Sequence, residues 1–296
     1  MNYRLHTLSG EEHTQLALAE FSVEEPKGVV QIIHGALEYK ERYFEFAHYL
    51  QQAGYAVILS DNRGHGKSVS KQDSFGLMRD FDSLVADQVS ISQWIQKRYP
   101  NRPLILFGHS FGSILARAYL QKNDQFLSKL ILTGTANYVT VVPVGIQLAK
   151  AFIKVRGELA YSPVLNYLSG NLGVEQEWLS NNPENNRKAK EDKKMVPRYP
   201  VRSLLTIWEG DRQLKAYDRY QCQNPDLPIL NVVGAEDKIT GGSRGVADTL
   251  KTLKKIGYHK LTNVVMEHMK HEVLNEVDNQ LVYEEILRFL EDSRKK

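Results

Sequence analysis

The sequence has little cysteine and no long apolar run. Cys222 is the single cysteine among 296 residues, so an internal disulfide is impossible and a reduced compartment such as the cytoplasm is expected. No run approaches the roughly 18 apolar residues that a membrane span needs. Residues 1–6 also lack the basic and apolar regions of a secretory signal. These absences favour a soluble cytoplasmic protein.

An excess of one charge sign and internal repeats are also missing. The formal net charge is +3, and the contents of 42% hydrophobic and 25% charged residues are typical of soluble globular proteins. Basic residues are spread along the chain without interleaved aromatic residues, apart from a mixed run at 187–194 and a lysine-rich end. This pattern predicts no nucleic-acid partner, while transient contact with an anionic membrane surface stays open.

Short apolar strands alternate with helical segments at both ends of the chain. The alternation predicts a mostly parallel sheet with helices on both of its faces. The first two strands are expected to form a hairpin. The predicted strands are 3–8, 14–21, 29–33, 55–59, 104–107, 129–132, 229–233 and 261–266, and the predicted helices are 43–53, 82–98, 112–121, 246–256 and 281–291.

Residues 137–217 interrupt this alternation. They contain helical patterns and polar, turn-rich stretches but no convincing strand. We therefore predict a helical cap at 137–217, with the core divided into 1–136 and 218–296. Stripes at helical spacing usually pack internally, so the stripe in this segment is expected to form the cap's own core. Its members are Val141, Val144, Leu148, Ala151, Phe152 and Val155.

The most informative local pattern is Gly-His-Ser-Phe-Gly at residues 108–112. Gly-x-Ser-x-Gly alone is a weak signal, but here it follows a predicted strand and precedes a predicted helix, as a nucleophile elbow requires. The tight turn strains the serine, and Gly108 and Gly112 would remove collisions on either side of it. The pattern predicts Ser110 as a nucleophile. The alternative is a glycine-containing loop without catalytic function.

A serine nucleophile needs a base to take its proton and an acid to orient that base. In folds that carry a nucleophile elbow, the partners follow the serine along the chain in the order acid, then histidine. Asp237 lies just after the strand predicted at 229–233 and is favoured over its neighbour Glu236. His268 and His271 both follow the last predicted strand, and position alone does not separate them.

The same chemistry needs two backbone N–H groups to hold the oxyanion. They belong to the residue after the nucleophile and to a loop after an earlier strand, which here predicts Phe111 and Ala36. His34 and Gly35 precede Ala36 directly after a buried strand; a plain turn is the alternative. This chemistry needs no metal ion and no organic cofactor.

Five segments then carry a resemblance to a known family. Residues 34–43 are similar to an HGxxEH…RY oxyanion segment, and residues 61–68 to a D-x-R-G-x-G-x-S loop. Residues 108–112 stand where GHSMG is usual, residues 227–238 resemble the acid segment, and residues 269–276 resemble an RHE-I/L-LNE ending. Together they resemble the monoacylglycerol lipase/lysophospholipase branch of the α/β hydrolases, which is grouped with serine aminopeptidase-like proteins.

The resemblance implies the α/β-hydrolase fold and a triad of Ser110, Asp237 and His271, because the first histidine of the ending is the catalytic one. It implies hydrolysis of a small lipophilic ester, such as a monoacylglycerol or lysophospholipid, without a cofactor. Tyr39 stands where the family usually has histidine, and Phe111 where methionine is common. We expect both near the acyl pocket or its rim, so substrate preference stays open.

Three other functions remain open: an aminopeptidase, an esterase for small soluble esters, and a silent hydrolase scaffold that binds lipid. Peptidases of this superfamily hold the substrate amine with acids of the cap, although surface acids are the commoner explanation for such residues. The candidates here are Glu158, Glu175, Glu177, Glu209 and Asp211. The oligomeric state cannot be derived from the sequence.

Overall fold

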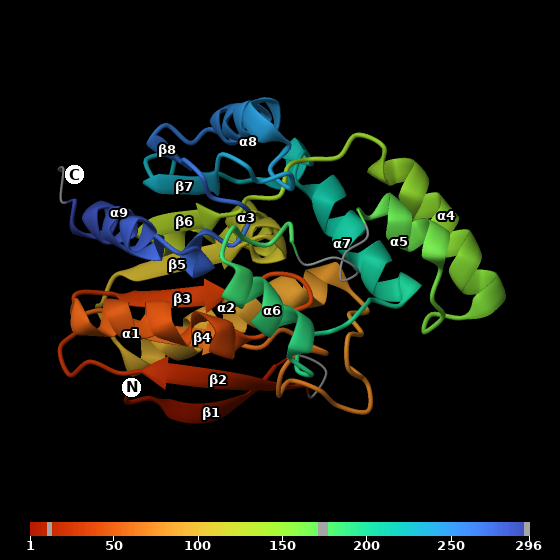
Figure 1. Ribbon diagram of the computed structural model, residues 1–296. Coiled ribbons are helices and arrows are strands. Elements are labelled where there is room, and N and C mark those ends of the chain that lie inside the picture. The colour runs from red at the N-terminus through yellow and green to blue at the C-terminus, as the bar shows by residue number, and fades with distance from the viewer. Residues whose placement is uncertain (11–13, 171–176, 293–296) are drawn as a thin grey trace.

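The computed structural model describes residues 1–10, 14–170 and 177–292 (Figure 1). Its centre is an eight-stranded sheet in the order β1-β2-β4-β3-β5-β6-β7-β8. β2 pairs antiparallel with β1 and β4, and every other pair in the sheet is parallel. The mostly parallel sheet is therefore confirmed. The strands are β1 Arg4–Ser9, β2 Gln15–Phe21, β3 Val29–Ile33, β4 Ala56–Ser60, β5 Leu104–His109, β6 Lys129–Thr133, β7 Ile229–Gly234 and β8 Leu261–Met266.

Helices cover both faces of the sheet, as predicted. α1 (Phe44–Gln52) and α9 (Asn279–Glu291) share one core cluster with the strands, while α2 (Phe81–Arg98), α3 (Phe111–Asn123) and α8 (Gly242–Ile256) share the other. Every residue of β3 and β4 is buried. Covering both faces explains why these strands are continuous apolar runs and not alternating ones.

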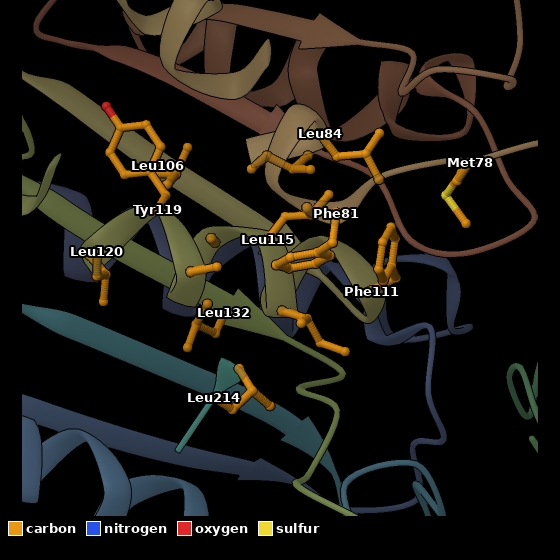
Figure 2. Packing of buried hydrophobic residues seen from close by; sticks show 14 of the residues in the cluster. Met78, Phe81, Leu84, Leu106, Phe111, Leu115, Tyr119, Leu120, Leu132 and Leu214 are labelled. Carbon is orange, nitrogen blue, oxygen red and sulfur yellow. The ribbon is translucent and has the colours of Figure 1, made fainter. Parts of the chain in front are cut away.

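The larger core cluster fixes the position of α3. Figure 2 shows Leu115 and Tyr119 of α3 packed near Leu106 of β5 and Leu132 of β6. All residues of α3 from Phe111 to Gln121 are buried, because the sheet, α2 and α7 (Val201–Gln213) pack around them. The start of this helix, where Ser110 lies, is therefore held by packing on several sides.

Helices fill most of the described part of residues 137–217. These are α4 (Val142–Arg156), α5 (Pro163–Leu168), α6 (Pro183–Glu191) and α7 (Val201–Gln213). Ser162 and Asn182 cap α5 and α6 through their side chains, and a proline follows each cap, which are strong start signals. α7 packs on α3 and α4, while α4 and α5 lie farther from the sheet, on the right in Figure 1.

The expected burial of the apolar stripe on α4 is wrong for every member except Phe152, which is half-buried against the core. Val144 and Val155 are 64% and 81% exposed, and Val141 and Leu148 are exposed as well. The buried face of α4 is instead formed by Val142, Ile146 and Ala149. α4 carries apolar residues on two faces, and periodicity alone does not tell which face the neighbouring helix covers. None of the helices in the described ranges is both long and apolar enough to cross a membrane.

Candidate active site

Ser110 lies at a sharp turn between β5 and α3. Its backbone has φ 52° and ψ −117°, in the positive-φ region that residues with a side chain rarely adopt. The Ser110 N–H donates to the carbonyl of Thr133 at 3.0 Å. Such a conformation costs about 1–3 kcal/mol and persists only where the surroundings impose it. The buried strand and helix on either side supply that constraint.

The two flanking glycines are required by close approach of the backbone. A Cβ on Gly112 would lie 2.2 Å from the carbonyl oxygen of Ile33, and a Cβ on Gly108 would lie 2.4 Å from the carbonyl oxygen of Gly112. Both distances are far below any normal contact. Residues larger than glycine at positions 108 and 112 would therefore collide with the backbone, as expected for the elbow.

Asp237 and His271 form a buried pair. Nδ1 of His271 lies 2.9 Å from Oδ2 of Asp237, and their side chains are 2% and 0% exposed. The N–H of Ile239 donates to the second oxygen of Asp237 at 2.8 Å. Nδ1 therefore carries a proton and leaves Nε2 as the acceptor of a neutral ring. Nε2 is buried and has no hydrogen-bond partner within the described residues.

The pair is electrostatically matched. Burial lowers the pKa of His271, but the charge of Asp237 and its hydrogen bond outweigh burial, so the pKa is raised above its ordinary value. Burial raises the pKa of Asp237, but the charge and hydrogen bond of His271 outweigh it and the pKa is lowered. The arrangement thus favours an ionised carboxylate beside an imidazole that can accept a second proton.

Two rings enclose His271. The ring centroids of His109 and Trp178 lie 4.8 Å and 5.0 Å from that of His271. Burial and the charge of His271 lower the pKa of His109 to about 4, so His109 stays neutral at pH 7. Trp178 belongs to the segment before α6, and no pattern in the sequence pointed to it.

The alternative acid and base lie elsewhere. The side chains of His268 and Glu236 are 93% and 47% exposed and lie 4.0 Å apart. Neither belongs to the lining of the cavity that contains His271. Among the described residues, the structure brings His271 and Asp237 together and leaves His268 at the surface.

The loop after β3 lies against the elbow. A Cβ on Gly35 would lie 3.0 Å from Cβ of Ser110, and the Gly35 N–H donates to Oε1 of Glu38 at 2.6 Å. His34 is buried; its Nδ1 lies 2.7 Å from the Gly35 carbonyl and its Nε2 accepts from the Asn62 N–H at 2.9 Å. His34 therefore braces the loop.

The residues of both predicted oxyanion donors line the same cavity. Ala36, Phe111, Ser110 and His271 all line it. Phe111 is the first residue of α3, so its N–H has no partner within the helix and is available at this end.

The cavity has a volume of about 410 Å³, and its walls are mostly apolar. Trp208 and Leu204 of α7 face it from one side, and Val144 and Leu148 of α4 line it as well. Its polar wall residues include the buried carboxyl groups Glu38, Asp211 and Glu272. This size is typical of pockets that enclose a small organic ligand.

The acidic residues of 137–217 differ in whether they line the cavity. Asp211 lines the cavity, whereas Glu158 pairs with Arg79, Glu209 pairs with Arg202, and Glu177 is exposed. Glu175 lies outside the described residues.

The two departures from the family pattern also differ in position. Phe111 lines the cavity as expected, but Tyr39 does not. The Tyr39 hydroxyl instead donates to Asp192 at the end of α6, in a small cluster with Leu179 and Met195. Leu179 and Met195 themselves line the cavity, so Tyr39 packs behind its wall, near the pocket as expected.

Metal-binding geometry is not found at this site or elsewhere in the described ranges, where no group of three or more His, Cys, Asp or Glu side chains is arranged to hold an ion.

Known proteins resemble the chain over most of its length. It is 28% identical over 275 residues to a monoacylglycerol lipase of Mycolicibacterium smegmatis, covering 90% of this chain and 89% of that one. It is 26% identical over 267 residues to the monoglyceride lipase of Mus musculus, covering 88% and 81%. A carboxyl esterase from Bacillus coagulans superimposes with a TM-score of 0.85 at 24% identity, over 98% of both chains.

A family model described as serine aminopeptidase, S33, matches residues 24–278. This match spans strands β3 to β8 of the sheet, the elbow and the helical segment together. The chain therefore belongs to the serine aminopeptidase S33 family of α/β hydrolases.

Proposed function

We propose that this protein is a serine hydrolase that cleaves the carboxylic ester of lipophilic monoesters, such as monoacylglycerols or lysophospholipids. One observation carries the proposal: Ser110 and the unpartnered Nε2 of His271 line one mostly apolar cavity, and Asp237 holds the opposite side of the His271 ring. The names of the relatives, monoacylglycerol lipase and monoglyceride lipase, support the same substrate class.

In the proposed mechanism, Nε2 of His271 takes the hydroxyl proton while Oγ of Ser110 attacks the ester carbonyl. The N–H groups of Ala36 and Phe111 donate to the oxyanion of the tetrahedral intermediate. His271 then protonates the leaving alcohol, and an acyl group remains on Ser110. Water, deprotonated by His271, attacks this acyl-enzyme and releases the carboxylic acid. Asp237 stabilises the imidazolium in both half-reactions.

The cavity walls support an acyl chain as the bound group. Each methylene that moves from water to an apolar wall contributes about 0.8 kcal/mol, roughly a fourfold gain in affinity. A cavity of 410 Å³ has room for several such groups. We propose that residues 137–217 act as the cap that supplies most of this wall, through α4 and α7.

A chain-length series tests this function. p-Nitrophenyl esters of two to sixteen carbons are hydrolysed with the wild type and with Ser110→Ala as control. We expect kcat/KM to peak at medium or long chains and activity to be lost in the variant. A peak at the shortest esters would move the substrate class to small soluble esters, and no hydrolysis at all would contradict ester chemistry.

An aminopeptidase is the second candidate, and the position of Asp211 is the observation that favours it. Asp211 lines the cavity and is buried, so it is placed to meet a substrate amine. Its two oxygens, however, already accept the Val139 N–H at 3.2 Å and 3.3 Å. Aminoacyl p-nitroanilides compared with the esters separate the two functions, and we expect the esters to be preferred by several orders of magnitude.

The uncovered surface of α4, α5 and the segments that flank them supports a transient membrane contact. Its exposed apolar residues are Val139, Val141, Val144, Leu148, Val155, Leu159, Tyr161, Val164, Tyr167 and Leu168. Lys150, Lys154 and Arg156 of α4 are exposed beside them. An apolar surface flanked by basic residues is typical of segments that lie in the interface of anionic membranes. Val144 and Leu148 also line the cavity, so such contact would bring the edge of the cavity to the lipid.

Vesicle binding tests this contact. Val155 and Val164 do not line the cavity, so Val155→Glu/Val164→Glu leaves the pocket intact. We expect its binding to vesicles of phosphatidylcholine and phosphatidylglycerol to weaken about tenfold or more, with unchanged kinetics on a soluble ester. Leu5→Glu on β1, where Leu5 is 55% exposed, serves as the matched control. Equal binding by all three proteins would contradict the proposal.

A further inference from the structure

The loop that follows β3 is strained at a residue other than glycine. Leu37, directly after Ala36, has φ 67°, in the left-handed region. A buried leucine keeps this conformation only if its surroundings impose it. The Ala36 N–H belongs to the peptide that precedes Ala36, and the peptide that follows joins Ala36 to Leu37. Whatever holds Leu37 therefore fixes one side of Ala36 and restricts the direction of the proposed oxyanion donor.

Both backbone groups of Leu37 are held by one segment of the chain between α6 and α7. The Leu37 N–H donates to the hydroxyl oxygen of Tyr199 at 2.6 Å, and the Val196 N–H donates to the Leu37 carbonyl at 2.8 Å. Tyr199 is 2% exposed, and Val196 is also buried. The two hydrogen bonds hold the N–H group and the carbonyl group on either side of the Leu37 α-carbon.

The hydroxyl of Tyr199 is itself fixed by His65. Nδ1 of His65 lies 2.9 Å from the carbonyl of Arg63, which can only accept, so this nitrogen carries the ring proton. Nε2 is then an acceptor, and the Tyr199 hydroxyl donates to it at 2.7 Å. Burial, with the nearby His34, lowers the pKa of His65 to about 3, so this tautomer persists at neutral pH. Tyr199 thus donates to His65 and accepts from Leu37 with no rotational freedom left.

We propose that Tyr199, oriented by His65, is a positioning residue that holds Leu37 and thereby aims the Ala36 N–H at the oxyanion. This inference rests on the proposed function, because it assumes that Ala36 is an oxyanion donor. It makes the segment that contains Val196 and Tyr199 part of the catalytic apparatus and not only a cover for the substrate. Phe111, the second donor, is held independently by α3.

Removing the hydroxyl should affect the transition state more than the bound substrate. Tyr199→Phe leaves the buried Leu37 N–H without an acceptor, and the strained turn loses one of its two supports. Complete loss of one oxyanion donor costs about 100- to 1000-fold in kcat, so a displaced donor is expected to cost about 10- to 100-fold. KM should change less than threefold, because the apolar walls are untouched.

Tyr119→Phe and Tyr258→Phe are matched controls. Each removes one buried hydroxyl, which donates to Ser92 at 3.1 Å or to Asp124 at 3.0 Å, and neither tyrosine lines the cavity. These variants report the cost of a lost buried hydrogen bond by itself. The readouts are kcat, KM, the melting temperature and the affinity for a trifluoromethyl ketone, whose hemiketal oxyanion mimics the intermediate.

We expect Tyr199→Phe to lower kcat and ketone affinity by similar factors, while the controls keep wild-type kinetics at comparable melting temperatures. His65→Phe keeps Tyr199 but removes its acceptor, and should shift the same two quantities in the same direction if Tyr199→Phe does not fold. Wild-type kcat and ketone affinity in folded Tyr199→Phe or His65→Phe would overturn the inference. Ser110→Ala is measured alongside: activity in that variant contradicts the proposed function, whereas its inactivity with an unaffected Tyr199→Phe contradicts this inference alone.

Discussion

Asp211 allows a quantitative test of the electrostatics of the cavity. This carboxyl is 4% exposed, and burial raises its pKa to about 7, more than the Val139 N–H and the charges of Arg117 and Lys215 lower it. In the unfolded chain the group should ionise with an ordinary pKa near 4. Replacing it by asparagine removes the ionisation while keeping an oxygen that can accept from Val139.

The sign follows from proton linkage. Because the folded pKa is the higher one, the contribution of Asp211 to stability is fully present below about pH 4 and is lost as the pH rises through about 7. One pKa unit corresponds to 1.36 kcal/mol, so the shift amounts to about 4 kcal/mol in total. Between pH 5 and pH 8, about 3 kcal/mol of this should be lost in the wild type and none of it in Asp211→Asn.

Urea unfolding at pH 5, 6, 7 and 8 measures this loss. The quantity compared is the change in unfolding free energy between pH 5 and pH 8, so a constant steric cost of the amide cancels. Between pH 5 and pH 8, we expect the unfolding free energy of Asp211→Asn to rise by about 3 kcal/mol relative to that of the wild type. Asp226→Asn, at an exposed carboxylate 3.7 Å from Lys260, is the control and should follow the wild-type curve. Parallel curves for wild type and Asp211→Asn would refute the reasoning.

Three further predictions concern the site itself. Asp237→Asn should lower kcat by about 10⁴, since the His271 tautomer is lost, whereas Glu236→Gln should keep most activity; equal effects in an ester assay would contradict the assignment of the acid. The raised pKa of His271 predicts that kcat/KM falls on acidification with a midpoint above 6.5, because the protonated ring cannot act as base; a pH–rate profile that is flat from pH 5 to 8 would contradict this. Gly112→Ala should destabilise the fold by at least about 2 kcal/mol, because the new Cβ would meet the Ile33 carbonyl at 2.2 Å, and an unchanged melting temperature would argue against the elbow geometry.

The sheet and the elbow were predictable because short sequence patterns reveal them. Buried parallel strands require continuous apolar runs, and the turn at Ser110 requires small residues at Gly108 and Gly112. The motif shows this requirement even though the collision at Gly112 would be with the distant carbonyl of Ile33. The choice of His271 over His268 needed the family resemblance, since both follow β8 at short distance. The structure then places His271 beside Asp237 and His268 in solvent.

Contacts between distant segments were not predictable. The bond between Leu37 and Tyr199 joins residues 162 positions apart, and nothing in either local pattern indicates it. The contact of Trp178 with His271 and the hydrogen bond from Tyr39 to Asp192 belong to the same class. The exposure of Val155 depends on which face of α4 its neighbours cover, which helical spacing does not encode.

The central claim is that Ser110 is the nucleophile that carries the acyl group. The most direct measurement is intact-mass analysis of the protein after treatment with a fluorophosphonate, followed by peptide mapping. The proposed mechanism predicts one adduct per chain, on Ser110. Its formation should be abolished in Ser110→Ala and slowed in His271→Ala. An unmodified Ser110 in enzyme that hydrolyses esters, or an adduct on another residue that persists in Ser110→Ala, would contradict it.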